Sequence, residues 1–245
     1  MPEIPDRQPR RTAGMAARLT AADPVVPPRF DAVILAGGQG TRLGGADKPG
    51  LAVGASTLAA IAVAAAAAAG AQRVIAVGPP RPELLPLAAR LPAGLVVVRE
   101  DPPGSGPVPA LRCGLGHVQQ PCVTVLAADL PFLRGDHLRA LVPVIAGNRG
   151  GRPAGAVLVD DEGRPQWLIG CWRTGSLRSA LRGYSGSSLR GLLMPLRPVM
   201  TSWDHCDGLP APWLDCDTPA DVSRARRWLA GAAPADPEDL ADPIA

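Results

Sequence analysis

Residues 33–48, VILAGGQGTRLGGADK, join a short apolar run to a glycine-rich loop. The pattern predicts a buried strand over about Phe30–Leu35 that leads directly into the glycines. A loop of this kind lies at the carboxyl edge of a sheet, where open α/β sheets bind ligands, and its bare backbone N–H groups suit phosphate oxygens. Because the loop also supplies two cations, Arg42 and Lys48, the stretch predicts a phosphate-binding site.

Lys48 is the only lysine among the 25 basic residues of the chain. An ammonium is a compact point charge on a flexible stem, whereas a guanidinium is a wide planar fork, so the two differ at a tight phosphate site. A single lysine beside a glycine loop, in a chain that otherwise uses arginine, therefore indicates a functional role.

Two common glycine loops do not fit this stretch. The dinucleotide fingerprint G-x-G-x-x-G has Leu43 in place of its third glycine, and no acid lies about twenty residues further on. The Walker phosphate loop requires Gly-Lys-Ser/Thr, but Gly45 is followed by Ala46 and Asp47. A Rossmann oxidoreductase and a P-loop protein are thus both disfavoured.

Apolar runs alternate with helical segments after the loop, which favours an α/β fold with a mostly parallel sheet. Further strands are expected over about Arg73–Val77, Gly94–Val98 and Cys122–Ala127, with paired strands over Ala156–Val159 and Gln166–Trp172. A helix is expected from Ser56 or Thr57 to Gly70, and a second one, interrupted by prolines, follows the strand at Arg73–Val77 and ends at about Ala89. Further helices are expected over Ala110–His117, Gly135–Ile145, Ser176–Leu181 and Ala220–Leu229. We predict one domain, residues 29–230, between a disordered leader, 1–28, and a disordered tail, 231–245.

Aspartates follow two of these segments in places that suit a metal ion. Asp129 comes directly after the apolar strand that ends at Ala127, at the same sheet edge as the glycine loop. Asp215 and Asp217 alternate in an extended piece, so both carboxylates face the same side, while Thr218 is placed to cap the last helix. Because Mg²⁺ prefers carboxylate and phosphate oxygens, these acids are candidate ligands beside a bound triphosphate.

The loop LAGGQGTRLGGADKP resembles the signature of the molybdenum cofactor guanylyltransferases, a branch of the small-molecule nucleotidyltransferases. The L-A-G-G-x-x-x-R-[LM]-G part marks the wider class, and the G-G-x-D-K ending is similar to the molybdopterin branch. Residues 128–131 and 215–222 match the family's A-D-x-P turn and its C-terminal N-x-N-T-P segment. In this chain aspartates replace both asparagines of that segment, so the segment does not indicate which branch of the class the chain resembles.

The resemblance implies a three-layer, Rossmann-like nucleotidyltransferase fold and transfer of GMP from GTP to the phosphate of molybdopterin, with release of pyrophosphate. It implies Arg42 and Lys48 as catalytic cations and Mg²⁺ on Asp129 with Asp217 or Asp215. The implied nucleotide-binding residues are Leu35, Ala36, Gly37, Gly38, Lys48, Asp101 and Asp129. Small-molecule partners would be GTP and molybdopterin, and proteins of molybdoenzyme maturation would be the macromolecular ones.

Two alternatives remain open from the residues alone. The first is cytidylyl transfer to molybdopterin, because no residue that we can place decides the base. The second is a non-catalytic nucleotide-binding adaptor in cofactor assembly, which the metal-binding acids disfavour.

Composition excludes other classes of function. The net charge is only +3 and no basic stripe carries interleaved aromatics, so we expect no nucleic-acid partner. Five cysteines without a C-x-x-C pair and three dispersed histidines argue against a zinc site and fit a reducing cytoplasm. The chain has neither an apolar run long enough to cross a membrane nor a signal-peptide core, so we expect a cytoplasmic protein.

Overall fold

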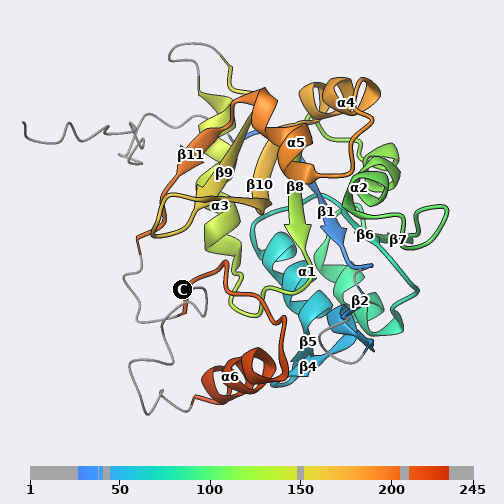
Figure 1. Ribbon diagram of the computed structural model, residues 1–245, viewed down its shortest axis with the longest axis vertical. Helices are drawn as coiled ribbons and strands as arrows, with labels where there is room; N and C mark the ends of the chain where they lie inside the picture. The colour runs from blue at the N-terminus through green and yellow to red at the C-terminus, as the bar shows by residue number, and fades with distance from the viewer. Residues whose placement is uncertain (1–26, 38, 41–44, 148–151, 205–209, 232–245) are drawn as a thin grey trace, which may run out of the picture.

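The computed structural model describes residues 27–37, 39–40, 45–147, 152–204 and 210–231. The expected leader and tail lie almost entirely outside these ranges. The strands of the central sheet are β1 (Phe30–Leu35), β6 (Val74–Val77), β7 (Leu95–Val98), β8 (Cys122–Ala127), β9 (Gly155–Val159), β10 (Pro165–Arg173) and β11 (Val199–Thr201). Within the described residues this sheet has seven strands in the order β11-β9-β10-β8-β1-β6-β7 (Figure 1).

The sheet is mostly parallel, as expected from the sequence. Only β10 runs antiparallel to its neighbours, β8 and β9, among the strand pairs of the described residues. The pairing of β9 with β10 confirms the two strands predicted after residue 145. The alternation of strand and helix along the chain thus produces the α/β fold that the sequence predicts.

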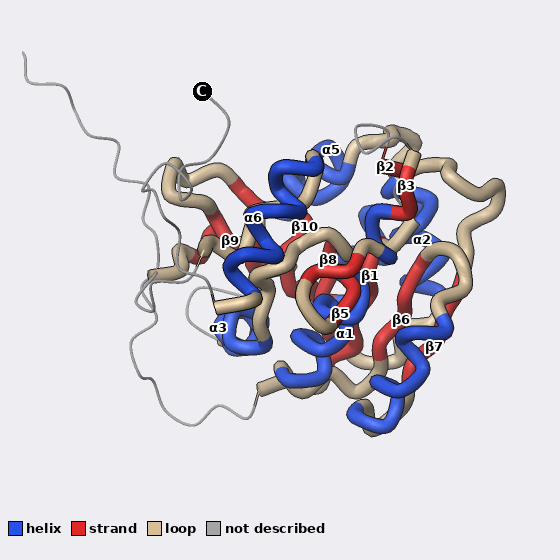
Figure 2. Tube along the Cα trace, turned by 90° about the horizontal axis from the view of Figure 1, so that it is seen from below, coloured by secondary structure: helices blue, strands red, loops and turns tan. Residues whose placement is uncertain are grey.

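Helices cover both faces of the sheet and give three layers (Figure 2). One face carries α1 (Leu58–Ala68), α3 (Gly135–Ala146) and the 3-10 segment η3 (Pro82–Arg90). The other carries α2 (Pro107–Gly116), α4 (Thr174–Arg182) and α5 (Leu189–Leu193). The last helix, α6 (Pro219–Leu229), packs against the small hairpin of β4 (Ala52–Val53) and β5 (Ser56–Thr57).

Strand β1 shows why the sequence of the central strands is mainly apolar. Ala32 and Ile34 pack on the α1 face, and Val33 packs on the α2 face, all with no exposed surface. A strand buried on both faces has no polar side, unlike a strand at a protein surface. Burying a side chain such as Ile34 contributes roughly 1.5–3 kcal/mol.

The register of the sheet brings several strand ends to one edge. Leu35 at the end of β1 pairs with Val77 of β6 and with Ala127 of β8, and Val77 pairs with Val98 of β7. Residues that follow these strands therefore share the carboxyl edge of the sheet, where the sequence predicts the ligand site.

Some local structure differs from expectation. The helix predicted through about Ala89 is the 3-10 segment η3, because Pro82 and Pro86 lack the N–H groups that an α-helix would use. Helix α2 begins at Pro107, three residues before the expected start. Helix α5 and strand β11 were not predicted. No helix in the described ranges has both the length and the apolar character needed to cross a membrane.

Candidate active site

The described part of the glycine loop turns the chain back toward the sheet. Strand β2 (Gln39–Gly40) pairs antiparallel with β3 (Ala46–Asp47), and the 3-10 turn η2 (Lys48–Gly50) follows at once. Pro49 at the first turn of η2 helps to start it, since its fixed backbone angle suits a helix start. This arrangement buries Lys48, which is 9% exposed, at the carboxyl edge of the sheet.

Two segments bring acids to the same place. Asp129 follows β8, and its backbone carbonyl accepts a hydrogen bond of 3.2 Å from the N–H of Cys216. Cys216 is fully buried with residues of α1 and α6, so Asp215 and Asp217 on either side of it face outward together. The predicted alternation of this segment is thereby observed.

Thr218 and Asp221 fix the end of the acidic segment. The hydroxyl of Thr218 accepts a hydrogen bond from the N–H of Asp221, and the Asp221 carboxylate accepts one from the N–H of Thr218. This capping box starts α6, with Pro219 in its first turn. Because Thr218 supplies the cap, Asp215 and Asp217 are not needed for it.

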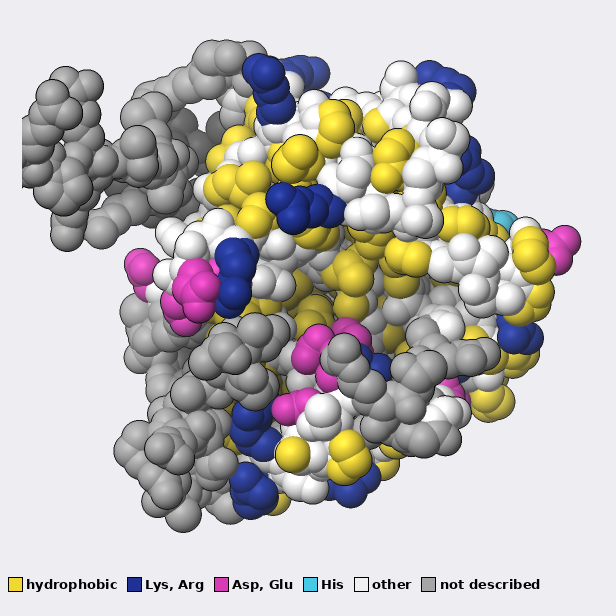
Figure 3. All heavy atoms as spheres, in the orientation of Figure 1, with side chains coloured by type: hydrophobic (Ala, Val, Ile, Leu, Met, Phe, Trp, Pro, Cys, Tyr) yellow, Lys and Arg dark blue, Asp and Glu magenta, His cyan; other side chains and the backbone are white. Residues whose placement is uncertain are grey.

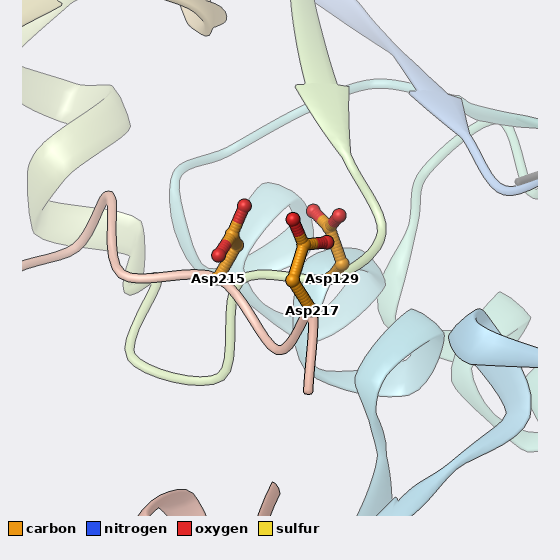
Figure 4. A group of neighbouring side chains, drawn as sticks. All are labelled: Asp129, Asp215 and Asp217. Atoms are coloured by element: carbon orange, nitrogen blue, oxygen red, sulfur yellow. The ribbon is translucent and has the colours of Figure 1, made fainter. Parts of the chain in front are cut away.

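Lys48 meets the acids across the sheet edge. Its Nζ donates a hydrogen bond of 2.6 Å to Asp129 Oδ2 and a second one to Asp217 Oδ1. Carboxylate oxygens of Asp129, Asp215 and Asp217 lie within 4.8 Å of one another, and their side chains converge in Figure 4. Acidic side chains also gather beside a basic one near the centre of the face in Figure 3. The structure thus joins a cation to three acids from distant parts of the chain.

The charges of this cluster shift the pKa of Lys48 and the pKa of Asp215. Burial disfavours the charged form of Lys48, but Asp129 and Asp217 outweigh burial and raise the pKa of its ammonium. Burial raises the pKa of Asp215 to about 6, and the charges of Asp129 and Asp217 act in the same direction against the opposing effect of Lys48. The cluster therefore holds more negative charge than one ammonium compensates.

This donor set fits a magnesium ion. Mg²⁺ takes oxygen ligands at about 2.1 Å in an octahedron, so its ligand atoms are at most about 4.2 Å apart. The three carboxylates offer oxygens within 4.8 Å of one another, which is close to that spacing. Oxygen-only donors and an excess of negative charge favour Mg²⁺ over softer metals.

Arg81 holds the residue that precedes Lys48. Its side chain is 2% exposed and donates to both carboxylate oxygens of Asp47, from Nη1 at 2.9 Å and from Nη2 at 2.5 Å. Nη2 also donates to the carbonyl oxygen of Ala36 at 3.2 Å. The hydrogen bond from Arg81 lowers the pKa of Asp47 against the effect of burial. Arg81 thus ties the start of the glycine loop to its exit, a link that we did not predict.

Two cavities border this edge of the sheet. The first, here the glycine-loop cavity, has a volume of about 560 Å³. The second, here the α2 cavity, has a volume of about 460 Å³ and includes Asp129. Both are lined by Gly37, Glu100, Pro103 and Gly104. Asp129, which contacts Lys48, therefore borders space that a nucleotide could fill.

The predicted nucleotide-binding residues other than Asp101, taken together with the catalytic Arg42, divide into three groups. Leu35 lines the α2 cavity, Ala36 lines the glycine-loop cavity, and Gly37 lines both. Gly38 and Arg42 lie outside the described residues, so their roles stay predictions. Lys48 and Asp129 are in contact, as the predicted site requires.

The acid predicted after the third strand is placed differently from its neighbour. Asp101 is exposed and lines neither cavity, whereas Glu100 is 6% exposed and lines both. The sequence presents the two acids side by side and carries no signal for which one turns inward. Glu100 is therefore a site residue that sequence reasoning missed.

Comparison with known proteins decides the family. A family model described as the MobA-like NTP transferase domain matches residues 32–206. The chain belongs to this family. It is a nucleotidyltransferase and a nucleotide is its substrate. The match includes the glycine loop and Asp129, and Asp215 and Asp217 follow it. No curated protein matched the chain.

Solved structures share the fold of this MobA-like transferase. A nucleotidyl transferase from Methanothermobacter is 20% identical with a TM-score of 0.64, over 84% of this chain and 99% of that one. A protein from Mycobacterium tuberculosis is 21% identical with a TM-score of 0.58, over 83% and 100%. A 4-diphosphocytidyl-2C-methyl-D-erythritol synthase from Anaerococcus prevotii is 11% identical with a TM-score of 0.57, over 83% and 96%. At these identities the likeness shows the fold alone.

Proposed function

We propose that the protein transfers GMP from GTP to the terminal phosphate of molybdopterin and releases pyrophosphate, with Mg²⁺ as cofactor. The observation that carries the proposal is the contact of Lys48 with Asp129 and Asp217 beside the α2 cavity, which Asp129 lines. The G-G-x-D-K ending of the loop, residues 44–48, supports the molybdopterin branch within the MobA-like family.

The attacking group in this reaction is a phosphate oxygen of the acceptor. A phosphate is already anionic near neutral pH, so the enzyme needs no general base to activate it. The chain's contribution is to align the two phosphates and to stabilise the charge that develops in the transition state. A site built from a lysine and carboxylates, with no histidine among the described residues that form it, fits that task.

The residues of the site divide this work. The backbone from Leu35 to Gly37 would hold the nucleoside at the sheet edge. The ammonium of Lys48, which now donates to carboxylates, would donate to oxygens of the α-phosphate and of the leaving pyrophosphate. Arg42 is proposed as a second cation on the triphosphate, from a part of the loop outside the described residues.

Asp129, Asp217 and Asp215 would hold the metal. A bound Mg²⁺ would supply positive charge that neutralises part of the negative charge of the phosphates. Asp129 and Asp217 already share the ammonium of Lys48, while Asp215 keeps a proton more readily than an ordinary aspartate. A divalent cation would compensate the carboxylates that one ammonium leaves unbalanced.

The test is to incubate the protein with molybdopterin, Mg²⁺ and each of the four triphosphates, and to identify the product by mass. We expect a GMP adduct of molybdopterin and an equivalent of pyrophosphate with GTP alone, and no product with excess EDTA. A CMP adduct formed from CTP would instead support the cytidylyl alternative. Binding of GTP without pyrophosphate release, in the presence of Mg²⁺ and molybdopterin, would support the adaptor alternative.

A further inference from the structure

Glu100 is a buried acid that the proposed mechanism leaves unused. It follows strand β7, is 6% exposed and lines both the glycine-loop cavity and the α2 cavity. Its Oε1 lies 3.5 Å from the position that a β-carbon on Gly37 would take. The carboxylate therefore lies against the residue that opens the glycine loop.

The two carboxylate oxygens of Glu100 differ in their partners. Oε1 accepts a hydrogen bond of 2.9 Å from the backbone N–H of Gly104. Oε2 is buried and has no hydrogen-bond partner in the described part of the chain. A buried acceptor without a donor is costly, so a ligand that brings N–H groups to this side chain gains from pairing with it.

The position of Glu100 suits contact with a nucleoside rather than with phosphates. Asp129 lines the α2 cavity together with Glu100, but it does not line the glycine-loop cavity. A nucleotide with its phosphates at Lys48 and Asp129 would extend its nucleoside past Gly37 toward Glu100. The end of the ligand that reaches Glu100 is then the base.

Guanine has the donors that such a carboxylate needs. Its N1–H and its 2-amino group point the same way along one edge of the base, and an ionised carboxylate offers acceptors only. Cytosine offers one amino group beside an acceptor nitrogen, which a carboxylate repels. We propose that Glu100 selects guanine by accepting hydrogen bonds from N1–H and the 2-amino group. This inference rests on the proposed function, in which GTP is the donor.

Glu100→Gln is the variant that tests this selection. Glutamine keeps the size of the side chain and can still accept from the Gly104 N–H, but it presents an NH₂ donor to the base. The unmodified protein should prefer GTP over ITP, which lacks the 2-amino group, by about 10- to 100-fold in kcat/KM. The variant should lose most of that preference, while 2′-deoxy-GTP should follow GTP in both proteins.

Glu162→Gln is the matched control, because it makes the same change from a carboxylate to an amide at an exposed position in the hairpin between β9 and β10. The control should keep the preference for GTP over ITP. Glu100→Gln should also unfold at a temperature no lower than the unmodified protein, because it removes a buried charge without changing the shape of the side chain.

An unchanged ratio of GTP to ITP in the Glu100→Gln protein would overturn the inference. A change in the ratio of GTP to 2′-deoxy-GTP instead would assign Glu100 to the ribose and overturn it as well. Calorimetric binding of GTP and ITP without an acceptor gives the same comparison. If molybdopterin is not the acceptor, no protein will show turnover and kcat/KM cannot be compared. The calorimetric comparison of GTP and ITP binding still decides the role of Glu100 in that case.

Discussion

The Nζ of Lys48 lies 2.6 Å from Oδ2 of Asp129, although 81 positions separate the two residues in the chain. Lys48 leaves the glycine loop after β1, and Asp129 follows β8, the strand that pairs with β1 in parallel. The contact is thus a direct result of the sheet register, which brings both strand ends to one edge. Asp217 joins the pair from the segment before α6 and completes a site made from three separate stretches of sequence.

The acids should set the magnesium requirement. Asp129→Asn and Asp217→Asn each remove one charged ligand, so both should raise the Mg²⁺ concentration for half-maximal activity by about 10-fold or more and lower the maximal rate. Titration of Mg²⁺ in a pyrophosphate-release assay measures both effects. Asp136→Asn, at an exposed ion pair on α3, is the control and should leave the titration unchanged. Equal magnesium dependence in all four proteins would exclude the acids as ligands.

Asp215 should make stability without metal depend on pH. Its pKa in the folded protein is about 6, above the ordinary value of 3.8 for an aspartate, so the folded state binds the proton more tightly than the unfolded chain does. Stability from this group is therefore highest below about pH 4 and is lost as the pH rises through 6. Asp215→Asn should stabilise the metal-free protein above pH 7 by about 1 kcal/mol, a value reduced for the exposure of this side chain.

Thermal unfolding in EDTA at several pH values measures the Asp215 effect. The gain in Tm from Asp215→Asn should be about 2–4 °C above pH 7 and should vanish below pH 4. Added Mg²⁺ should remove or reverse the gain, because it would bind the unmodified protein more tightly. A gain in Tm that is the same at pH 4 and pH 8 would show that folding does not raise the pKa of Asp215.

Arg81 should be important both for stability and for turnover. Arg81→Ala removes the donors to the Asp47 carboxylate and to the Ala36 carbonyl, so we expect a loss of about 1–3 kcal/mol in the free energy of unfolding. The value stays in that range because the Asp47 side chain is 58% exposed. Turnover should fall in conditions where the variant is folded, since Lys48 follows Asp47 directly.

Chemical denaturation and steady-state kinetics separate the two effects of Arg81. Arg164→Ala is a suitable control, because Arg164 pairs with Asp160 at the hairpin between β9 and β10. It should reduce stability with little change in kcat. If Arg81→Ala behaved in the same way, the link from Arg81 through Asp47 to Lys48 would have no role in catalysis.

The sequence was sufficient for the features that depend on local patterns. An apolar run followed by glycines predicted β1 and its loop, and the run before Asp129 predicted β8 and its place at the same edge. Thr218 and Pro219 predicted the start of α6, where the capping box is found. In each case neighbouring residues in the chain determine the structure, and the parallel sheet then aligns the strand ends.

Features that depend on distant contacts could not be predicted. The partner of Asp47 is Arg81, which is 34 residues away, and nothing in the spacing of the two indicates a contact. Glu100 and Asp101 are adjacent acids, and only the packing of the loop after β7 decides that Glu100 faces the cavities. Strand β11 spans Val199–Thr201, which is too short for a periodic pattern to emerge.

The turnover of Lys48→Ala is the most direct test of the central claim, that this ammonium and the acids of the cluster act on one polyphosphate. The assay is pyrophosphate release from GTP with molybdopterin and Mg²⁺, with circular dichroism to verify that the variant is folded. The account predicts a loss of about 10²- to 10³-fold in kcat, and Lys48→Arg should recover little of it because a guanidinium does not fit the place of an ammonium. Near-normal turnover in a folded Lys48→Ala protein would contradict the account.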